Sequence, residues 1–504
     1  MIVDVSATQL MIAALLIPWA AALLIPAFSR FPNLREGVTL LAAALQAYVV
    51  WALFQAVVAS PRLLGDGALD LNVLQIAPKL ELAIKVEPLG LLFALVASSL
   101  WIVNSIYSIG YMRANNEPRQ TQFYVCFAVA IGATMALAFS KNLFSLFLFY
   151  EVLTLSTYPL VTHKANDEAM KGGRVYLGLL IGTSMVLFLP AIIITGYIAG
   201  ALDFVPGGIL ADRLSAPALG LLLALFVFGI GKAALMPFHF WLPAAMVAPT
   251  PVSALLHAVA VVKAGVFTVV KVIVYIFGIE TLREAGSGAW LAWAAGFTVL
   301  AASVVALRQD NLKKRLAYST VSQLSYVVLA AAILTPISIM GAAMHIAGHA
   351  VSKITLFFAA GSIYTASKKT LVSQLDGIGW KMPWTMGAFA IGAIAMIGLP
   401  PTAGFLSKWF ILTGATSAEH WLAVGVIVIS TMLNAAYFLP IVLRAFFSSP
   451  ADTPAANSTG VVDHGEAPWP MVLALTVTAA MTIALFVWPD VPLQLVQLLV
   501  GGGV

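Results

Sequence analysis

The chain alternates between long apolar tracts and short polar connectors along almost its whole length. Runs of roughly 20 apolar residues recur, which is the length that an α-helix needs to cross the hydrocarbon core of a bilayer. Backbone groups in hydrocarbon must be hydrogen-bonded internally, and tracts of this length achieve that as helices. The pattern predicts an all-α polytopic membrane protein with about 14 transmembrane helices. We place the spans at residues 8–28, 37–59, 88–110, 121–140, 142–162, 173–199, 216–238, 251–278, 289–306, 318–334, 336–365, 384–414, 421–447 and 470–489.

Two of the connectors between apolar tracts are longer than the others, and their composition predicts their structure. In 60–87, the segments "LDLNVLQIA" and "LELAIKV" partly alternate apolar and polar residues, which predicts a small external β-hairpin. Residues 448–468 are rich in Pro, Ala, Ser and Asp and are expected to form a polar linker before the last helix. We divide the chain into 1–115 (helices 1–3 and the hairpin loop), 121–278 (helices 4–8), 289–447 (helices 9–13) and 448–504 (the linker and helix 14).

Composition excludes several classes of protein. The 504 residues are 61% hydrophobic and 9% charged, with too few polar side chains to cover a water-soluble domain. One cysteine, Cys126, cannot form an internal disulfide or hold an Fe–S cluster. The "GIGK" at 229–232 lies within an apolar tract and not after a strand, so it is not interpreted as a phosphate loop. We expect no cofactor, no metal and no redox centre in this chain, which is at most one component of a larger translocase.

The positive charges predict the orientation in the membrane. Fifteen Lys and Arg flank one set of alternate loops: Arg30, Arg35, Arg113, Arg119, Lys164, Lys171, Arg174, Arg308, Lys313, Lys314, Arg315, Lys368, Lys369, Lys381 and Arg444. Seven flank the other set: Arg62, Lys79, Lys85, Lys141, Arg213, Lys271 and Arg283. Cytoplasmic loops carry the excess of positive charge. The first set is therefore predicted to be cytoplasmic, and an even number of spans then places both termini outside.

The remaining charges lie where membrane helices rarely carry any. Four lysines fall within spans, namely Lys232, Lys263, Lys353 and Lys408, and Glu151 in "LFLFYEVLTL" is the one acid of 21 placed deep inside a span. Each costs roughly 2.5–3.5 kcal/mol at the centre of a bilayer, so such residues are functional by default. Any one of them could instead be structural, since a lysine can extend to the interface. Lysine can release its proton when desolvated and arginine in practice cannot, so the choice of lysine favours proton transfer.

Histidines join these lysines within the spans. His345, His349 and Lys353 are spaced i, i+4 and i+8, so on a helix they fall near one face and step by about 6 Å. This spacing is typical of a ladder of protonatable groups, although a polar seam between neighbouring helices would have the same pattern. His257 lies in the span of Lys263.

Two spans are interrupted by prolines. "ALMPFHFWLP" contains Pro237 and His239, and "IGLPPTAGFLSKWFIL" contains Pro400, Pro401 and Gly404. Proline frees backbone carbonyls, and this is tolerated at membrane depth only where protein or water receives them. Lys232 precedes the first interruption and Lys408 follows the second. Matched broken helices are typical of transporters built from inverted repeats, whereas unrelated proline kinks are the ordinary alternative.

Four tracts resemble the antiporter-like subunits of the complex I superfamily. They are "MPFHFWLPAAMVAPTPVSALLHAVAVVKAG", "NLKKRLAYSTVSQLSY", "GHAVSKITLFF" and "GLPPTAGFLSKWFIL", and the resemblance covers roughly residues 85–447. The family includes the L-, M- and N-type subunits of NADH–quinone oxidoreductase, the A- and D-type subunits of Mrp-type cation/proton antiporters and counterparts in membrane-bound hydrogenases. It implies 14 helices, inverted five-helix repeats at helices 4–8 and 9–13, and discontinuous helices 7 and 12.

The resemblance also implies roles for the buried charges. Glu151 takes the place of the helix-5 glutamate and Lys232 that of its helix-7 lysine partner, which we expect to act as a switchable pair. Lys263 matches the helix-8 lysine, and Lys408 matches the terminal residue of helix 12. His349 and Lys353 match the helix-11 relay. His345 is added on its geometry, one turn earlier on the same helix. Protons would enter by one half-channel, cross the central residues and leave by way of Lys408.

Departures from the family pattern narrow the choice of subunit. Position 408 is Lys where the M-type subunit usually has Glu, and Ala244 stands where many members have an acid. The tract "AMVAPTPVSA" is more similar to the L and A types, yet the long lateral helix of those types is not expected here. We expect a Na⁺/H⁺-type antiporter subunit most similar to the D type of Mrp antiporters, in a bacterial inner membrane. The alternative is a proton-pumping M-, N- or L-like subunit of NADH–quinone oxidoreductase or a membrane-bound hydrogenase.

Partners follow from the same resemblance. We expect other membrane subunits, protons, Na⁺ or K⁺ and the lipid bilayer, and no nucleic acid. A scaffold without transport activity would not need the full set of buried charges. A secondary transporter that works without partner subunits would have to transport as the purified chain alone.

Overall fold

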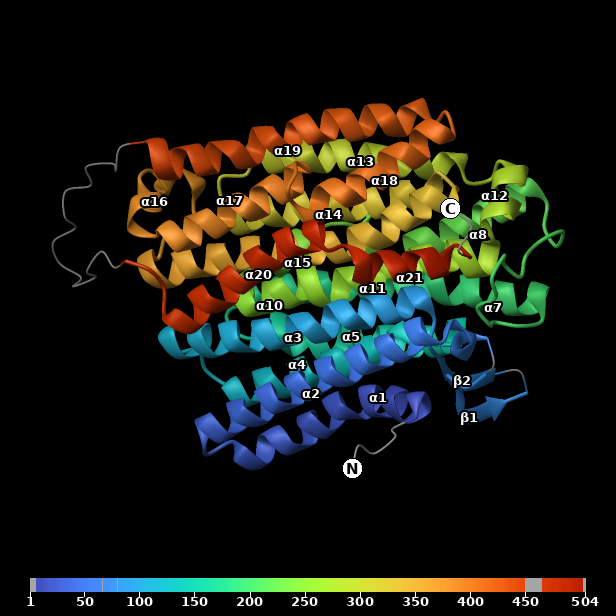
Figure 1. Ribbon diagram of the computed structural model, residues 1–504, viewed down its shortest axis with the longest axis horizontal. Coiled ribbons are helices and arrows are strands. Elements are labelled where there is room, and N and C mark those ends of the chain that lie inside the picture. Colours follow the sequence, from blue (N-terminus) through green and yellow to red (C-terminus); the bar gives the residue numbers. More distant parts are fainter. Residues whose placement is uncertain (1–5, 66, 79, 449–464, 502–504) are drawn as a thin grey trace.

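The computed structural model describes residues 6–65, 67–78, 80–448 and 465–501, with the side chain of His257 excepted. Its helices pack side by side with their axes roughly along the long dimension of the molecule (Figure 1). Most of the predicted linker 448–468 lies outside the described residues.

Helices α1 to α12 make up the first half of the chain. Their bounds are α1 Ala7–Leu24, α2 Pro32–Ala59, α3 Pro88–Ala114, α4 Gln120–Ala138, α5 Leu143–Val161, α6 Asp167–Thr183, α7 Leu189–Ala199, α8 Ala216–Gly229, α9 Trp241–Ala244, α10 Thr250–Ala254, α11 Val261–Val272 and α12 Ile279–Ala285. Three π-helical segments continue some of them: Ser184–Phe188 joins α6 to α7, Leu255–Val259 joins α10 to α11, and Ile273–Phe277 follows α11.

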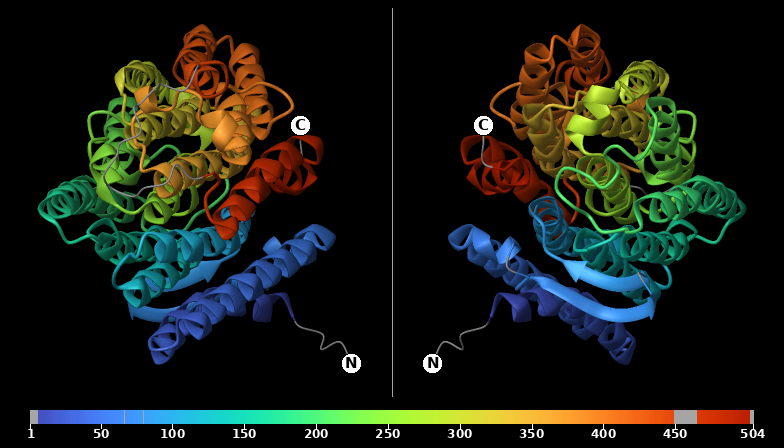
Figure 2. Two further views of the ribbon diagram at one scale, coloured as in Figure 1. Left: turned by 90° about the vertical axis from the view of Figure 1, so that its left-hand side faces the viewer. Right: turned by 90° about the vertical axis from the view of Figure 1, so that its right-hand side faces the viewer.

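Helices α13 to α21 make up the rest. Their bounds are α13 Ala289–Arg308, α14 Leu312–Ala332, α15 Pro336–Ser367, α16 Ile378–Lys381, α17 Pro383–Ile397, α18 Ala403–Ser417, α19 Trp421–Phe447, α20 Trp469–Val487 and α21 Asp490–Leu499. Seen end-on, α1 and α2 form one edge of the bundle and α19 lies near the opposite edge (Figures 1 and 2). Helix α15 lies between them, and every residue in its most apolar window is buried.

The predicted spans correspond to helices in the structure. Within the described residues, ten helices are long and apolar enough to cross a membrane. The other predicted spans coincide with α8, with α10 to α11, with α14, and with α17 to α18. Helix α14 has 21 residues but low hydropathy, because its first turn carries Lys313, Lys314 and Arg315 and its remainder carries several buried hydroxyl side chains. The prediction of an all-α polytopic membrane protein is confirmed.

The two discontinuous spans are present, and the first break begins earlier than expected. Helix α17 ends at Ile397, Gly398 follows in the left-handed region at φ +90°, and α18 begins at Ala403. Helix α8 ends at Gly229, well before Pro237, and passes into the 3₁₀ turn Gly231–Ala233. A Cβ on Gly231 would overlap the Thr183 hydroxyl, so this close packing requires glycine. Lys232 therefore lies inside the break, whereas the sequence pattern places it ahead of the break.

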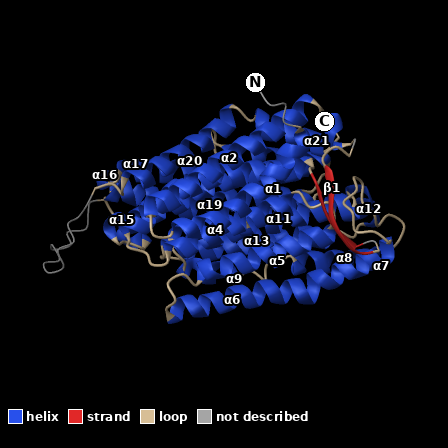
Figure 3. Cartoon of the chain, turned by 90° about the horizontal axis from the view of Figure 1, so that it is seen from below, coloured by secondary structure: helices blue, strands red, loops and turns tan. Residues whose placement is uncertain are grey.

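The predicted hairpin is present at one end of the bundle. Strand β1 (Asp70–Ala77) pairs antiparallel with β2 (Leu80–Lys85) in register Asp70 to Lys85. The strands lie at the same end as α7, α8 and α12 (Figures 1 and 3). The Thr8 hydroxyl at the start of α1 donates to Ala68 O beside the hairpin, and α21 ends at the same side. Both ends of the described chain thus lie at the hairpin end, as an even number of spans requires.

Candidate functional site

The charged residues that the sequence singled out are buried in the structure. Exposed fractions are 0% for Lys232, Lys263 and Lys353, 1% for His345 and His349, 6% for Lys408 and 8% for Glu151. They come from α5, the first break, α11, α15 and α18. His257 belongs to the π-helical segment Leu255–Val259, and its side chain lies outside the described part of the structure.

The first break holds Lys232 against one turn of α5. Its Nζ donates to Tyr150 O (2.9 Å) and to the Thr154 hydroxyl, and it lies 3.2 Å from the centroid of the Tyr150 ring. The backbone N–H of Lys232 donates to the Tyr150 hydroxyl (3.1 Å). Tyr150, Glu151 and Thr154 lie on one turn of α5. The Lys232 ammonium group is therefore held against the same turn that carries the Glu151 carboxylate. The ring face and the backbone oxygen both favour a cation at this point.

Glu151 differs from the other buried acids of the described residues. Glu36 is ion-paired with Arg35 and Arg113, and Glu87 is ion-paired with Lys271. Neither carboxylate oxygen of Glu151 has a hydrogen-bond partner among the described residues. Lys232 in turn contacts Tyr150 and Thr154, so the structure holds the predicted pair close but not bonded. Since a buried carboxylate without a bonded partner is costly, a cationic partner would stabilise Glu151, and Lys232 is the cation nearest to it in this break.

The centre of the bundle brings α11 and α15 into direct contact. Lys263 Nζ and His349 Nδ1 lie 2.5 Å apart. The rings of His349 and His345 stack with centroids 5.8 Å apart, and His345 Nδ1 lies 2.9 Å from the Ser407 hydroxyl. In the predicted ladder, the middle residue His349 therefore meets Lys263 on α11, and the first residue His345 meets Ser407 on α18.

The second break presents backbone carbonyls to Lys408. Its Nζ donates to Met396 O (3.0 Å) and Ile397 O (2.8 Å), the last residues of α17. Four carbonyls at a helix C-terminus lack intrahelical partners and carry a partial negative charge, so this position stabilises a cation without an acid. The Lys408 ammonium also lies 4.9 Å from the Tyr326 ring centroid.

A second connection runs from Lys353 to Lys408 through residues that the sequence did not reveal. Lys353 Nζ donates to Ser319 Oγ (2.9 Å), and the Tyr437 hydroxyl lies 3.1 Å from the same oxygen. Tyr437 also hydrogen-bonds the Asn434 side-chain oxygen, and Asn434 Nδ2 donates to Met396 O (3.3 Å), which also accepts from Lys408. Ser, Tyr and Asn are common in helices, so no signal in one sequence distinguishes these three.

The supporting residues of the breaks have identifiable structural roles. Pro237 and His239 lie in the irregular stretch between Ala233 and Trp241, and His239 is 6% exposed with its ring beside Phe240. Pro400 and Pro401 form the turn between α17 and α18. A Cβ on Gly404 would overlap the Ala395 carbonyl oxygen, so glycine allows α18 to begin against the end of α17.

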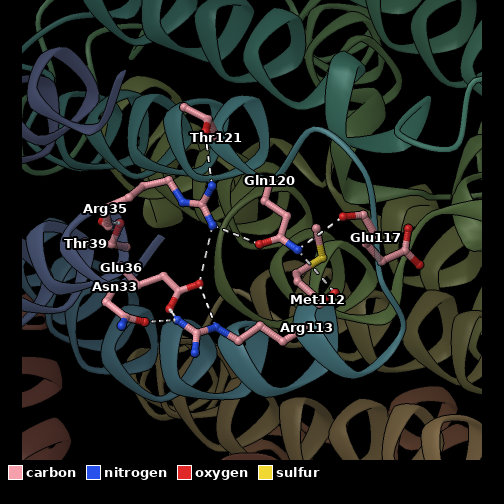
Figure 4. A network of polar contacts seen from close by, with 9 residues as sticks. All are labelled: Asn33, Arg35, Glu36, Thr39, Met112, Arg113, Glu117, Gln120 and Thr121. Carbon is pink, nitrogen blue, oxygen red and sulfur yellow. Dashed lines mark hydrogen bonds and ion pairs between the residues drawn. The ribbon is translucent and has the colours of Figure 1, made fainter. Parts of the chain in front are cut away.

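A further polar network lies away from this row, at the end opposite the hairpin. Arg35 and Arg113 both pair with Glu36, and Arg35 also donates to Thr121 and Gln120 (Figure 4). The network joins α2, α3 and the start of α4. It is built from fixed arginine charges, which makes it a structural clamp, not a relay.

No metal site accompanies the row in the portion of the chain that the structure describes. No group of three or more His, Cys, Asp or Glu side chains there is arranged to hold a metal ion. Besides Glu151, the buried site residues and the hydroxyl and amide groups that contact them are Lys, His, Tyr, Ser and Asn side chains. Each can donate a hydrogen bond, and each can accept one, the lysine only after it has lost a proton. The arrangement is suited to passing protons.

Comparison with known proteins identifies relatives over most of the chain. Residues 140–434, more than half of the chain, match the family described as NADH:quinone oxidoreductase/Mrp antiporter, TM. NADH-quinone oxidoreductase subunit N of Desulforudis audaxviator is 33% identical over 73% of this chain and 74% of its own length. The A/B subunit of a probable K(+)/H(+) antiporter of Rhizobium meliloti is 32% identical over 74% of this chain. This chain spans only 38% of the length of that antiporter protein.

Solved structures share the fold at lower sequence identity. A chain of the Mrp complex from Dietzia sp. DQ12-45-1b superposes with a TM-score of 0.82 at 18% identity, covering 99% of this chain and 98% of that chain. A chain of the membrane-bound sulfane sulfur reductase, an archaeal respiratory membrane complex, gives 0.83 at 23% identity and covers 97% of both. These likenesses show that the fold is shared over essentially the whole length.

Proposed function

The chain belongs to the NADH:quinone oxidoreductase/Mrp antiporter transmembrane family, and we propose that it moves protons as one membrane subunit of a larger complex. One observation carries the proposal. Buried protonatable side chains lie at both helix breaks, Lys232 near Glu151 at the first and Lys408 at the second, and Lys263, His349 and His345 form a row of contacts between the breaks. Intramembrane ionisable groups are costly and are typical of proton relays. In this proposal, water carries the proton from Lys232 to Lys263 and from His345 to Lys408.

The first break supplies the switch in this proposal. Lys232 rests on Tyr150 and Thr154 while the Glu151 carboxylate stays unbonded. A shift of Lys232 toward Glu151 would form the ion pair and stabilise the protonated lysine. Withdrawal would leave the ammonium group with neutral partners only, which favours release of its proton toward Lys263. Movement of partner subunits would set which of the two positions is populated.

Two finer assignments compete, and both have relatives in support. The first is a monovalent cation/proton antiporter subunit similar to the D type of Mrp antiporters, supported by the fold of the Dietzia Mrp chain. The second is a proton-pumping subunit of a redox complex, supported by the identity to the N-type subunit. Purification of the native complex separates them, because flavin and Fe–S proteins would accompany the chain in the second case and small membrane subunits in the first.

Further expectations from the sequence belong to the same proposal. We place the protein in a bacterial inner membrane with the hairpin and both termini outside. We also propose two inverted repeats at 121–278 and 289–447, which lie between an N-terminal region at residues 1–115 and a C-terminal region at residues 448–504. Each proposed repeat holds one of the two broken spans and one lysine at the break.

The direct test uses Glu151→Gln and Lys232→Ala in the assembled complex. Inverted vesicles from a strain that expresses the complex would be assayed for proton movement with a pH-sensitive dye. Each variant is expected to lose at least tenfold in rate, with normal amounts of complex on native gels. The exposed acid Glu168→Gln serves as the matched control and is expected to transport normally. Normal rates in both variants at normal assembly would refute the proposal.

A further inference from the structure

A second acid–lysine pair is buried outside the row described above. Lys271 Nζ lies 3.0 Å from Glu87 Oε2 and donates to Ser140 O (2.7 Å). Lys271 is 0% exposed and Glu87 is 5% exposed. The ammonium group also faces the Phe204 ring at 4.2 Å. The sequence pattern places Lys271 among the residues flanking external loops, but the structure buries it near the end of α11. No step of the proposed switch uses this pair.

Lys271 is aligned with the central lysine on the same helix. Lys263, Phe267 and Lys271 are spaced i, i+4 and i+8 on α11, so they lie near one face and span about 12 Å. Phe267 stands between the two lysines, with its ring centroid 5.6 Å from Lys271 Nζ and 5.2 Å from the Phe93 ring. The spacing matches that of His345, His349 and Lys353 on α15, but the central side chain here is a phenyl ring, which neither donates nor accepts a proton.

Glu87 connects the pair to the surface at the hairpin end. It lines a cavity of about 470 Å³ together with Lys85, Tyr275 and Val274. The cavity wall also includes the exposed residues Pro206, Gly207, Glu280 and Gly501. Most of the other lining residues are apolar, among them Leu64, Val86, Ile279, Ile339 and Leu498. The polar side chains of the cavity are Lys85, Glu87, Tyr275 and Glu280, and water that enters from the exposed rim would reach Glu87 along them.

We propose that Glu87 and Lys271 form a further proton-transfer site, which links Lys263 to water at the hairpin end of the bundle. The site rests on the proposed function of the row. In the outward direction, the Lys271 ammonium gives its proton to the Glu87 carboxylate, leaving a neutral amine and a carboxylic acid. The acid releases the proton to water in the cavity. The amine takes the next proton from the Lys263 ammonium through water admitted beside the Phe267 ring, because the phenyl group itself cannot carry a proton. The inward direction reverses these steps.

The environment of Glu87 is consistent with this role. Burial raises the pKa of the Glu87 carboxyl, and the adjacent Lys271 offsets part of that rise. A carboxyl whose neutral form is accessible is suited to accept and release a proton. The competing interpretation is a structural clamp that fastens α11 to the start of α3. A clamp needs only two side chains that bond to each other, whereas a relay needs two side chains that can gain and lose protons. The experiment therefore keeps the hydrogen bonding and removes the ionisable groups.

The test removes both charges together. Glu87→Gln with Lys271→Gln keeps two hydrogen-bonding side chains of similar size and leaves no unpaired buried charge. Glu280→Gln is the matched control, because Glu280 lines the same cavity but is exposed and pairs with Arg283. In vesicles of the assembled complex, the double variant is expected to slow proton movement at least tenfold and the control by less than twofold. Wild-type rates in the double variant would overturn the proposal.

Two further arms keep the outcome decisive. Glu151→Gln is measured in parallel: if it is inactive while the double variant is active, only the Glu87–Lys271 site is refuted, and if it is active, the proposed function itself fails. The second arm introduces Val274→Cys in a Cys126→Ala background. A small polar thiol reagent added from the hairpin side should modify Val274→Cys, and the same reagent from the other side should not. An unreactive cysteine would show that water does not reach the cavity, which refutes the proposal even where the double variant fails to assemble.

Discussion

Each of the two helix breaks stabilises a buried lysine, and the groups that stabilise it differ. At the first, Lys232 lies in the irregular chain itself and contacts Tyr150 and Thr154, with the Glu151 carboxylate on the same turn. At the second, Lys408 lies on the helix after the break and contacts two carbonyls at the end of α17. The first lysine thus has a carboxylate nearby that is not bonded to it, and the second has a fixed dipole.

This difference assigns different tasks to the two sites. A carboxylate can pair or separate, so the stability of the charge on Lys232 can change with a small movement. Helix carbonyls do not change sign, so the environment of Lys408 is more constant. We infer that the first break switches and that the second receives and releases protons in response to its neighbours.

The largest expected effect tests whether Lys408 must release its proton. Lys408→Ala removes the amine, and Lys408→Arg keeps hydrogen bonds to Met396 and Ile397 but does not deprotonate in practice. Both variants should slow proton movement in vesicles about 10- to 100-fold. If the role of Lys408 were only to cap α17, arginine would restore the rate and alanine would not.

Removal of Tyr437 from the second connection should have a smaller effect. Tyr437→Phe deletes the hydroxyl between Ser319 and Asn434, and the loss of one buried hydrogen bond of about 1 kcal/mol predicts a rate about five times lower.

Tyr150→Phe at the first break keeps the ring and the backbone oxygen that contact Lys232 Nζ, so a change of less than about twofold is expected. The same vesicle assay compares them, and a reversed order would contradict the two assignments.

Substitution of Glu36, a buried acid outside the row, should lower stability without slowing transport. Glu36→Gln leaves Arg35 and Arg113 without their anionic partner, which should cost about 1–3 kcal/mol of stability. Thermal unfolding in detergent should begin at a lower temperature, while transport per assembled complex stays within about twofold of wild type. Glu151→Gln should slow transport and leave the unfolding temperature unchanged, because its carboxylate has no bonded partner to lose. Loss of transport in Glu36→Gln at normal assembly would contradict the clamp.

The smallest effect concerns pH at the end opposite the hairpin. Burial, followed by the nearby Arg119, lowers the pKa of His163 from 6.5 to about 4, and burial raises the pKa of Glu117 beside it. The unfolded chain binds this proton between pH 6.5 and 4 whereas the folded chain does not. The stability that the neutral His163 contributes to the folded state is therefore fully present above pH 6.5 and is lost as the pH falls toward 4.

His163→Gln removes that dependence. Melting temperatures of the purified protein, taken from about pH 7 to about pH 5, should fall roughly 1–2 °C further in wild type than in the variant. Parallel curves would show that His163 does not titrate between these values.

Hydropathy and charge made most of the fold and much of the row predictable. A span must be apolar over its length, so each of the roughly 14 tracts and the isolated charges inside them are visible without coordinates. The prolines showed that two spans are broken, but not that the first break begins at Ile230. Gly231 packs closely against Thr183 at that position, and this contact between two helices is not visible in the local sequence.

The sequence by itself determined that this protein crosses the membrane many times and carries a costly set of buried Lys, His and Glu residues. These are single-residue properties, set by the free energy of transfer into hydrocarbon. Only the tertiary structure decided which of those residues meet, Lys263 with His349 and Lys408 with the end of α17, and that Lys271 and Glu87 are buried as a pair. Such contacts join helices far apart in the chain, and a few ångströms decide whether two groups exchange a proton. The unbonded carboxylate of Glu151 is likewise a property of its neighbours and not of its position in an apolar run.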